Sequence, residues 1–230
     1  MDEIEPGPRP MPDPESSQPS RQPLSRTVIF DAAIRIAEAD GVSALSMRRL
    51  GAALGVQAMS LYHHVASKRD LLDGVAGHLL AQMTMPDPED RDWQACSRVI
   101  SRSYRKLGHD HPDLFPYVIE RPLAAPESLP PLEAVLGVFR HAGFDVQTSY
   151  YAFGTFASYV AGFTLDEIAE RGQGPTGRSG DHVPELGEVP EEYRIVHEVL
   201  GAVSLDQDAA FEFGLDLILA GLEQRLRAAD

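Results

Sequence analysis

The feature that most constrains this chain is residues 46–68, whose pattern predicts two short helices joined by a tight turn. Ser46 is a residue type that begins helices, because its hydroxyl can accept a backbone N–H that has no partner in the first turn. Gly55 is suited to the left-handed conformation in which helices often end. A second helix of about two turns is predicted over residues 57–64. Two helices joined by a short turn containing glycine form the arrangement whose second helix enters the DNA major groove.

The segment Ser67-Lys68-Arg69-Asp70 predicts the start of the next helix. Ser67 and Asp70 have the spacing of a capping box. Lys68 and Arg69 place positive charge at the positive end of a helix dipole, which costs a few tenths of a kcal/mol for each cation. A bound phosphate would account for both residues. The alternative is a solvated basic pair that only keeps the surface soluble.

These strings resemble the DNA-binding domain of the tetracycline-repressor (TetR) family over residues 24–83, through ALSMRRL at 44–50, LGV at 54–56, LYHHV at 61–65 and KRDLL at 68–72. Trp93-Gln94 and the segments 142–144 and 211–223 are similar to the ligand-binding half of the tetracycline repressors proper. The resemblance implies an all-α fold with an N-terminal three-helix domain that contains the helix-turn-helix. A larger helical ligand-binding and dimerisation domain follows. We therefore expect a DNA-binding domain at 24–83 and the second domain at 84–230. The many prolines and the lack of an apolar block in residues 1–23 predict a disordered, Pro-rich tail.

The expected DNA contacts combine the groove-facing positions that the resemblance implies with nearby polar and basic side chains: Ser46, Arg48, Gln57, Ala58, Met59, Ser60, Tyr62, His63, His64 and Lys68. Gln57 and Ser60 can hydrogen-bond base edges, and Met59 can contact a thymine methyl group. Lys68 is better suited to a phosphate, which positions the protein without specifying sequence. His64 has two open interpretations, a DNA contact or support for the turn that follows it.

The charge of the chain is segregated in a way that permits DNA binding. The net charge is −15 overall, but residues 21–83 contain seven Lys/Arg against five Asp/Glu, while residues 84–230 carry −13. Exposed charges more than about 10 Å apart are largely screened near 0.1 M salt. The acidic body therefore weakens the encounter with DNA without preventing it, and we expect affinity to depend on few phosphate contacts and on a dimeric footprint.

The rest of the chain is predicted to be helical, in segments separated by turn residues: 25–41, 92–107, 132–142, 146–169, 191–203 and 208–227. Residues 172–188 are predicted to form a surface loop, and prolines break residues 112–131 into short pieces. The helices at 146–169 and 208–227 carry more apolar surface than a lone subunit can bury. The resemblance implies that they pair with their symmetry mates in a four-helix bundle, giving a homodimer; the alternative is that both pack on their own subunit.

The ligand half departs from the founding members of the family. Those proteins bind a magnesium–tetracycline chelate through His, Asn and His, which align here with Thr84, Ile100 and Val118. None of these three side chains can take that role, so a tetracycline chelate is not the expected effector. We expect instead an apolar cavity lined by aromatic residues, and the alternative is that these residues are ordinary core: Tyr104, Tyr117, Phe139, Tyr151 and Phe156.

No catalytic pattern, cofactor motif or metal site is predicted. The triplet His109-Asp110-His111 lacks an evident further ligand, and no apolar run is long enough for a membrane span. The single cysteine, Cys96, permits no internal disulfide and indicates a reducing cytoplasm. We expect a cytoplasmic repressor that a small-molecule effector releases from a palindromic double-stranded DNA operator. The alternative is an all-helical small-molecule-binding protein or enzyme that kept the fold without DNA binding.

Overall fold

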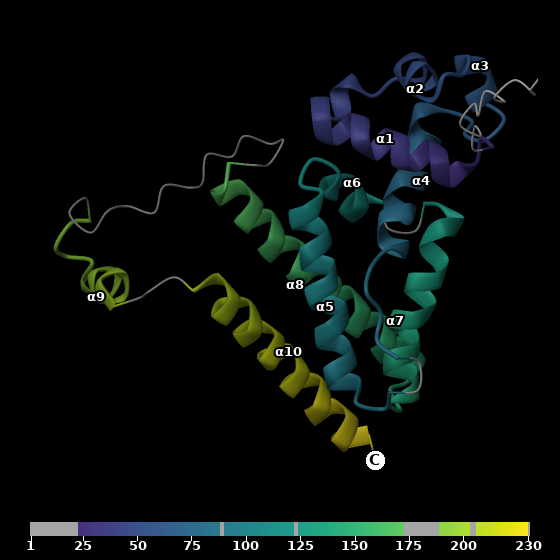
Figure 1. Ribbon diagram of the computed structural model, residues 1–230. Coiled ribbons are helices and arrows are strands. Elements are labelled where there is room, and N and C mark those ends of the chain that lie inside the picture. The colour runs from purple at the N-terminus through teal and green to yellow at the C-terminus, as the bar shows by residue number, and fades with distance from the viewer. Residues whose placement is uncertain (1–22, 88–89, 122–123, 173–188, 203–205, 230) are drawn as a thin grey trace, which may run out of the picture.

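Helices form every regular element in the residues that the computed structural model describes, which are 23–87, 90–121, 124–172, 189–202 and 206–229. This confirms the all-α prediction. Figure 1 shows α1, α2 and α3 at one end of the molecule, with the C-terminal end of α10 at the opposite end. The α-helices are α1 (Arg26–Asp40), α2 (Met47–Leu54), α3 (Ala58–Leu61), α4 (Lys68–Ala81), α5 (Trp93–Asp110), α6 (Phe115–Glu120), α7 (Leu129–His141), α8 (Val146–Glu170), α9 (Arg194–Ala202) and α10 (Gln207–Ala229), and two single 3-10 turns are η1 (Val42–Ala44) and η2 (Pro126–Ser128).

Three serine caps begin the helices of the N-terminal part, as the sequence predicts. The hydroxyls of Ser25, Ser46 and Ser67 each accept the backbone N–H three residues later, at 3.3, 3.2 and 3.1 Å. Each of these bonds satisfies a donor that the first helical turn leaves without a partner. Gly41 and Gly55 end α1 and α2 with φ of 80° and 65°, which residues with a Cβ adopt at a cost.

The core of the N-terminal part lies where α1 packs against α2 and α4. Phe30 is 1% exposed and its ring fits against Gly74 of α4, where an added Cβ would lie 2.2 Å from Phe30 Cζ. A glycine at position 74 is therefore what lets the two helices approach so closely. The other large buried side chains of this region come from all four helices and the turns between them: Ile29, Leu45, Leu50, Leu61, Leu71 and Leu79.

This core continues past residue 83 into the rest of the chain. Leu107 of α5, Phe115 and Val118 of α6, and Ile168 of α8 are buried in the same apolar cluster as Phe30. The expected boundary at 83/84 therefore does not coincide with a gap in the core. A second cluster joins α7, α8 and α10 at the other end of the molecule, and its largest members are Phe139, Phe144, Phe156 and Phe211.

Several predicted boundaries were wrong. The second helix of the helix-turn-helix is Ala58–Leu61, four residues where 57–64 was predicted, because the chain turns at residues 62–64. Helix α6 was not predicted, and α7 begins at Leu129 instead of 132. Pro130 and Pro131 lie in the first turn of α7, where a missing N–H removes no helical hydrogen bond. Residues 1–22 of the predicted tail and 173–188 of the predicted loop lie outside the described residues.

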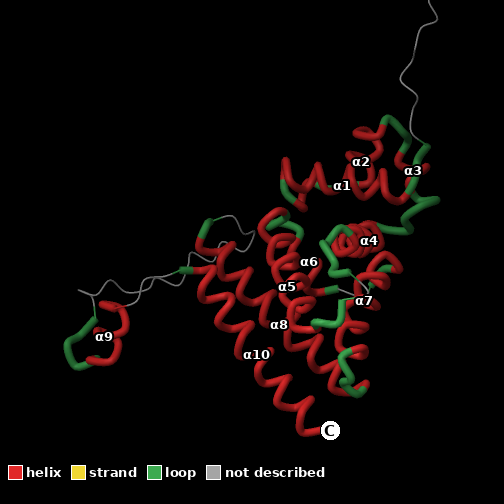
Figure 2. The backbone as a smooth tube through the Cα atoms, turned by 60° about the horizontal axis from the view of Figure 1, so that its bottom comes forward, coloured by secondary structure: helices red, strands yellow, loops and turns green. Residues whose placement is uncertain are grey.

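Helices α8 and α10 lie side by side, and α8 also packs against α5 and α7 (Figure 2). This accounts for the apolar composition of α8 around most of its circumference. Both helices nevertheless keep exposed apolar side chains: Tyr150 and Tyr151 on α8 are 61% and 63% exposed, and Phe213 on α10 is 66% exposed. Helix α9 lies apart from the other helices in both views and buries none of its own side chains. Within the described ranges, no helix combines the length and apolarity that crossing a bilayer requires.

Candidate DNA-binding surface and ligand cavity

The turn between α2 and α3 is held by two glycines. At Gly55 the N–H groups of Gly55 and Val56 donate to the carbonyls of Ala52 and Gly51, at 3.2 and 2.9 Å, in the pattern of a Schellman motif. Gly51 is needed for a different reason, because a Cβ there would lie 2.9 Å from the carbonyl oxygen of Val56. The chain therefore turns sharply after α2 and presents α3 at a fixed angle to it.

The expected DNA contacts on α3 and the following turn lie largely on the outer side. Leu61 is fully buried and anchors α3 to the core, whereas Met59 is 70% exposed and Tyr62 48% exposed. Gln57 and His63 are also exposed. The remaining members of the predicted set on this segment are half-buried: Ala58, Ser60 and His64. One buried anchor and a largely exposed outer side are the geometry that a major-groove helix requires.

The basic start of α4 lies beside this surface in sequence and is well ordered by its cap. Ser67 Oγ accepts the N–H of Asp70, and Asp70 Oδ2 accepts the backbone N–H of Ala66 at 2.7 Å, one residue before the Ser67 N–H that a capping box would use. Lys68 and Arg69 are exposed, and neither side chain pairs with another side chain in the described part of the molecule. Both side chains are therefore open to the bound phosphate that the sequence suggests for this helix start.

The other two predicted contacts lie at the start of α2. Arg48 is exposed, whereas its neighbour Arg49 forms an ion pair with Asp40 of α1. Ser46 is exposed, but its hydroxyl already accepts the N–H of Arg49 as the helix cap. Arg48 is therefore available to an anion, and the Ser46 hydroxyl can still donate its own hydrogen to one.

A cavity of about 250 Å³ lies between α4, α5, α6, α7 and α8, and its wall is mostly apolar. Tyr104 of α5 is on this wall, with its ring 5.2 Å from that of Phe115. Burial raises the pKa of the Tyr104 phenol well above its usual value, so the hydroxyl stays neutral and can donate a hydrogen bond. The side chains on the wall are Leu80, Met83, Ile100, Ser101, Tyr104, Ile119, Ser128, Pro131, Leu132, Val135, Phe153, Phe156, Ala157, Ser158, Val160 and Ala161.

Two of the five predicted ligand residues, Tyr104 and Phe156, are on this wall, and three are not. Phe139 is buried behind it, with its ring stacked on that of Phe156 at 5.8 Å. Tyr117 is on α6 away from the lining residues, and Tyr151 projects outward from the beginning of α8, before the stretch that faces the cavity. The presence of an aromatic ring did not distinguish residues on the cavity wall from residues elsewhere, because whether a ring faces the cavity depends on how its helix packs against neighbouring helices.

The contribution of α4 to the cavity was not predicted from the sequence. Leu80, in the last turn of α4, and Met83, just after the helix, lie on the wall, so α4 connects the DNA-binding part with the ligand cavity. Because α4 was assigned to the DNA-binding domain alone, its residues were not considered as part of the cavity wall.

The three positions that align with the chelate ligands of the founding members are dispersed. Ile100 lines the cavity, Val118 is fully buried in the core, and the backbone N–H of Thr84 donates to Ser103 Oγ at 2.7 Å. No group of three or more potential metal ligands gathers among the described residues. His109 and His111 point to different carboxylates, Glu167 at 2.9 Å and Glu38 at 2.7 Å.

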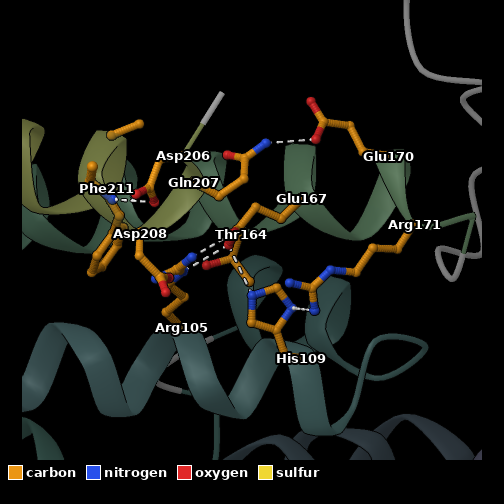
Figure 3. Close-up of polar contacts among 12 residues, drawn as sticks. Arg105, His109, Thr164, Glu167, Glu170, Arg171, Asp206, Gln207, Asp208 and Phe211 are labelled. Carbon is orange, nitrogen blue, oxygen red and sulfur yellow. Dashed lines mark hydrogen bonds and ion pairs between the residues drawn. The ribbon is translucent and has the colours of Figure 1, made fainter. Parts of the chain in front are cut away.

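An ionic cluster centred on the buried Glu167 joins α5, α8 and α10, and its member on α10, Asp208, is exposed (Figure 3). Glu167 is 2% exposed and accepts two hydrogen bonds from Arg105, at 2.8 and 2.5 Å, and one from His109 Nε2 at 2.9 Å. Arg105 also pairs with Asp208 of α10 at 2.8 Å and lies over the ring of Phe211. Burial is the largest single influence and opposes ionisation of Glu167, but the hydrogen bonds and charge of Arg105, together with His109, outweigh it and lower the pKa of the carboxyl group.

Comparison with known families matches both parts of the chain. Residues 29–75 match the family described as bacterial regulatory proteins, tetR family, and residues 85–226 match the tetracyclin repressor-like C-terminal domain.

Individual relatives cover most of the chain. The HTH-type transcriptional repressor DrrR1 of Streptomyces coeruleorubidus is 33% identical over 90% of this chain and 81% of its own length. The tetracycline repressor protein class C of Escherichia coli is 32% identical over 87% of this chain and 91% of its own length. Among solved structures, the Streptomyces coelicolor TetR family protein ActR in complex with actinorhodin is 30% identical, with a TM-score of 0.75 over 89% of this chain and 99% of that one.

Proposed function

Because the chain belongs to the TetR family of bacterial regulatory proteins, we propose that it is a homodimeric transcriptional repressor that a small molecule releases from its operator. The observation that carries this proposal is the helix-turn-helix with exposed α3, joined through α4 to an apolar cavity. The protein acts in the cytoplasm, where its operator lies, and it works by binding and not by catalysis.

The contacts with DNA divide into two roles. Gln57, Ala58, Met59, Ser60 and His63 lie against base edges in the major groove and select the sequence. A second group of side chains contacts phosphates and fixes the position of the protein without selecting bases: Ser46, Arg48, Tyr62, Lys68 and, on the evidence of its exposure, Arg69. His64 lies at the edge of this surface and contributes its backbone carbonyl to the fold.

The dimer forms through α8 and α10. Phe213 and Leu217 on α10 are 66% and 60% exposed in the single subunit, a large apolar surface for a lone chain. Gly162 on α8 and Gly221 on α10 have no atom within 4 Å of an added Cβ, so a second copy can approach their backbones closely. The two recognition helices of such a dimer, about 34 Å apart or one turn of DNA, would then match the two half-sites of a palindromic operator.

The effector is a small, largely apolar molecule with an aromatic ring system. The cavity wall is mostly apolar, and Tyr104 offers a ring and a neutral hydroxyl to such a ligand. Relatives of this chain include a protein solved with actinorhodin and proteins named as tetracycline repressors. A magnesium–tetracycline chelate is not favoured, because Thr84, Ile100 and Val118 replace its usual ligands. Binding needs to favour the released state by only about 1–3 kcal/mol to act as a switch.

The test begins with selection of bound fragments from the host genome by the purified protein. We expect enrichment of one or a few inverted repeats and a shallow dependence of affinity on salt, since each phosphate contact contributes a slope of about −0.9 in log K against log salt. A steep slope without preference for inverted repeats would contradict a sequence-specific repressor. Actinorhodin, and minocycline with and without Mg²⁺, are then titrated against the complex as probes of release.

Variants of the proposed DNA contacts test the division between residues that contact bases and residues that contact phosphates. Lys68→Ala should weaken binding to all sequences alike, whereas Gln57→Ala or Ser60→Ala should change the preferred half-site. Lys106→Ala removes the same side chain from α5, where it pairs with Asp110, and serves as the control. A change of base preference with Lys68→Ala alone would reverse the assignment.

The alternative function is a helical small-molecule-binding protein or enzyme that does not bind DNA. It predicts ligand binding in the same cavity, but no enriched DNA fragment in the selection. The exposed Lys68 and Arg69 at a capped helix start favour the repressor.

A further inference from the structure

Arg26, at the start of α1, joins parts of the molecule that are far apart in sequence. Its Nη1 donates to the backbone carbonyl of His64 at 2.7 Å, and its Nε donates to Glu127 Oε1 at 2.7 Å. Its Nη2 lies 3.5 Å from the other oxygen of Glu127 and 4.0 Å from Asp70. The guanidinium also lies 5.0 Å from the centre of the Phe30 ring, which limits its freedom to move.

The bond to His64 reaches the end of the recognition segment. Helix α3 is only four residues long, so its own hydrogen bonds give it little rigidity. The chain after it turns through hydrogen bonds from His64 and Val65 to the carbonyl of Leu61. The contact from Arg26 is therefore an external support at the point where α3 ends.

Glu127 belongs to η2, which lies between the ligand cavity and α4. The next residue, Ser128, is on the cavity wall, and its Oγ is buried without a hydrogen-bond partner among the described residues. At Gly77 of α4 an added Cβ would lie 2.9 Å from Ser128 Oγ and 3.0 Å from Glu127 Cβ. This close packing means that a ligand that displaces Ser128 must also displace Glu127 or α4.

We propose that Arg26 is a positioning residue that ties the end of the recognition helix directly to the cavity wall through Glu127. The Glu127 carboxylate is the nearest charged partner of the guanidinium, at 2.7 Å against 4.0 Å for Asp70, and so is the main group that directs it toward the His64 carbonyl. An effector that moves η2 breaks this bridge and frees the end of α3, in addition to any movement of α4. The inference rests on the proposed function and assigns it a coupling route that bypasses α4.

A different role for Arg26 makes the opposite prediction for Glu127. If Arg26 only contacted a DNA phosphate, loss of the neighbouring negative charge in Glu127→Gln would leave affinity unchanged or raise it. If Arg26 positions α3, Glu127→Gln removes half of the bridge and lowers operator affinity despite the less negative protein. The sign of the change in affinity therefore separates the two roles.

The experiment measures affinity for the selected operator with the full-length dimer, without effector, over a series of salt concentrations. The variants are Arg26→Gln, Glu127→Gln and the double variant. Arg35→Gln removes an exposed arginine from the same helix, and Glu133→Gln removes an exposed carboxylate from α7, so these two are the controls. Thermal melts report whether each variant is folded.

We expect Arg26→Gln and Glu127→Gln each to weaken operator binding by between about two- and thirtyfold, the range of coupling through residues that do not touch the ligand. The double variant should be no weaker than Arg26→Gln, and the salt slope should stay that of the wild type. Amide hydrogen exchange over residues 61–66 should be faster in both single variants than in the controls.

Three results would overturn the inference: unchanged or tighter binding by Glu127→Gln, losses that add in the double variant, or a salt slope reduced by about 0.9 in Arg26→Gln, which indicates a lost phosphate contact. If Arg26→Gln does not fold, Glu127→Gln still decides between the two roles. A wild-type protein that bound no DNA would instead overturn the proposed function itself, and with it this inference.

Discussion

Replacement of Glu167 by leucine should destabilise the protein strongly while leaving its surface unchanged. The carboxylate is 2% exposed and accepts three hydrogen bonds, two of them from Arg105. Removing one partner of a buried ion pair costs about 3–5 kcal/mol, because the other charge stays buried without compensation. Arg105 would keep Asp208 and the face of Phe211, so we expect the lower end of this range.

A loss of about 3 kcal/mol corresponds to a fall in Tm of about 6–12 °C for a chain of this size. The melts are compared at one protomer concentration, since the Tm of a dimer depends on concentration. Glu170→Leu is the matched control, because Glu170 is exposed on the same helix and its partner is Gln207 of α10. It should change stability by no more than about 0.5 kcal/mol.

The contribution of Glu167 to stability depends on pH. The pKa of Glu167 is lower in the folded protein than in the unfolded chain, so its stabilisation is complete above the unfolded value of about 4.3 and is lost as the pH falls through the folded value. The difference in stability between wild type and Glu167→Leu should therefore be full at pH 7 and shrink below about pH 4.

Arg105→Met combined with Glu167→Leu replaces the pair by apolar side chains and should be more stable than Glu167→Leu alone. A Glu167→Leu protein that melts like the wild type, or a double variant whose losses simply add, would refute this account of the cluster.

Three further predictions concern the fold, the dimer and the cavity. Gly74→Ala should cost about 1–3 kcal/mol through overpacking against Phe30, visible as a lower Tm, and an unchanged melt would contradict the close approach of α1 and α4. Phe213→Ser should shift the protein from dimer to monomer in sedimentation velocity and weaken operator binding with it; a dimer of wild-type affinity would argue against α10 as the interface. Tyr104→Ala should raise the probe concentration needed to release DNA while ligand-free operator affinity stays the same, whereas a lower Tm with unchanged release would make Tyr104 a core residue only.

The fold was predictable where one residue type determines the local structure. Ser25, Ser46 and Ser67 mark helix starts because a side-chain hydroxyl satisfies a backbone donor, and Gly55 marks a helix end because it accepts a positive φ. Helix α6 and the start of α7 were missed because prolines in a first turn resemble prolines in a loop, and only packing distinguishes them: Phe115 of α6 and Pro131 of α7 are buried.

The candidate DNA contacts were more predictable than the cavity residues, again because local sequence determines where they lie. They lie within one short segment, so the position of Leu61 in the core orients the rest. The cavity is assembled from five helices, and whether a ring faces it depends on how those helices are rotated against one another. Tyr104 and Tyr151 have similar chemistry, yet one lies on the wall and the other in solvent.

The core shared between the two functional parts limits how this regulator can be recombined with others. Leu107, Phe115 and Ile168 complete an apolar cluster that begins with Ile29 and Phe30. A hybrid made by fusing residues 24–83 to the effector half of another regulator would cut through that cluster and leave its two sides mismatched. A working hybrid should carry α6 and the facing parts of α5 and α8 with the DNA-reading part, so that the exchanged unit is a packed body and not a length of sequence.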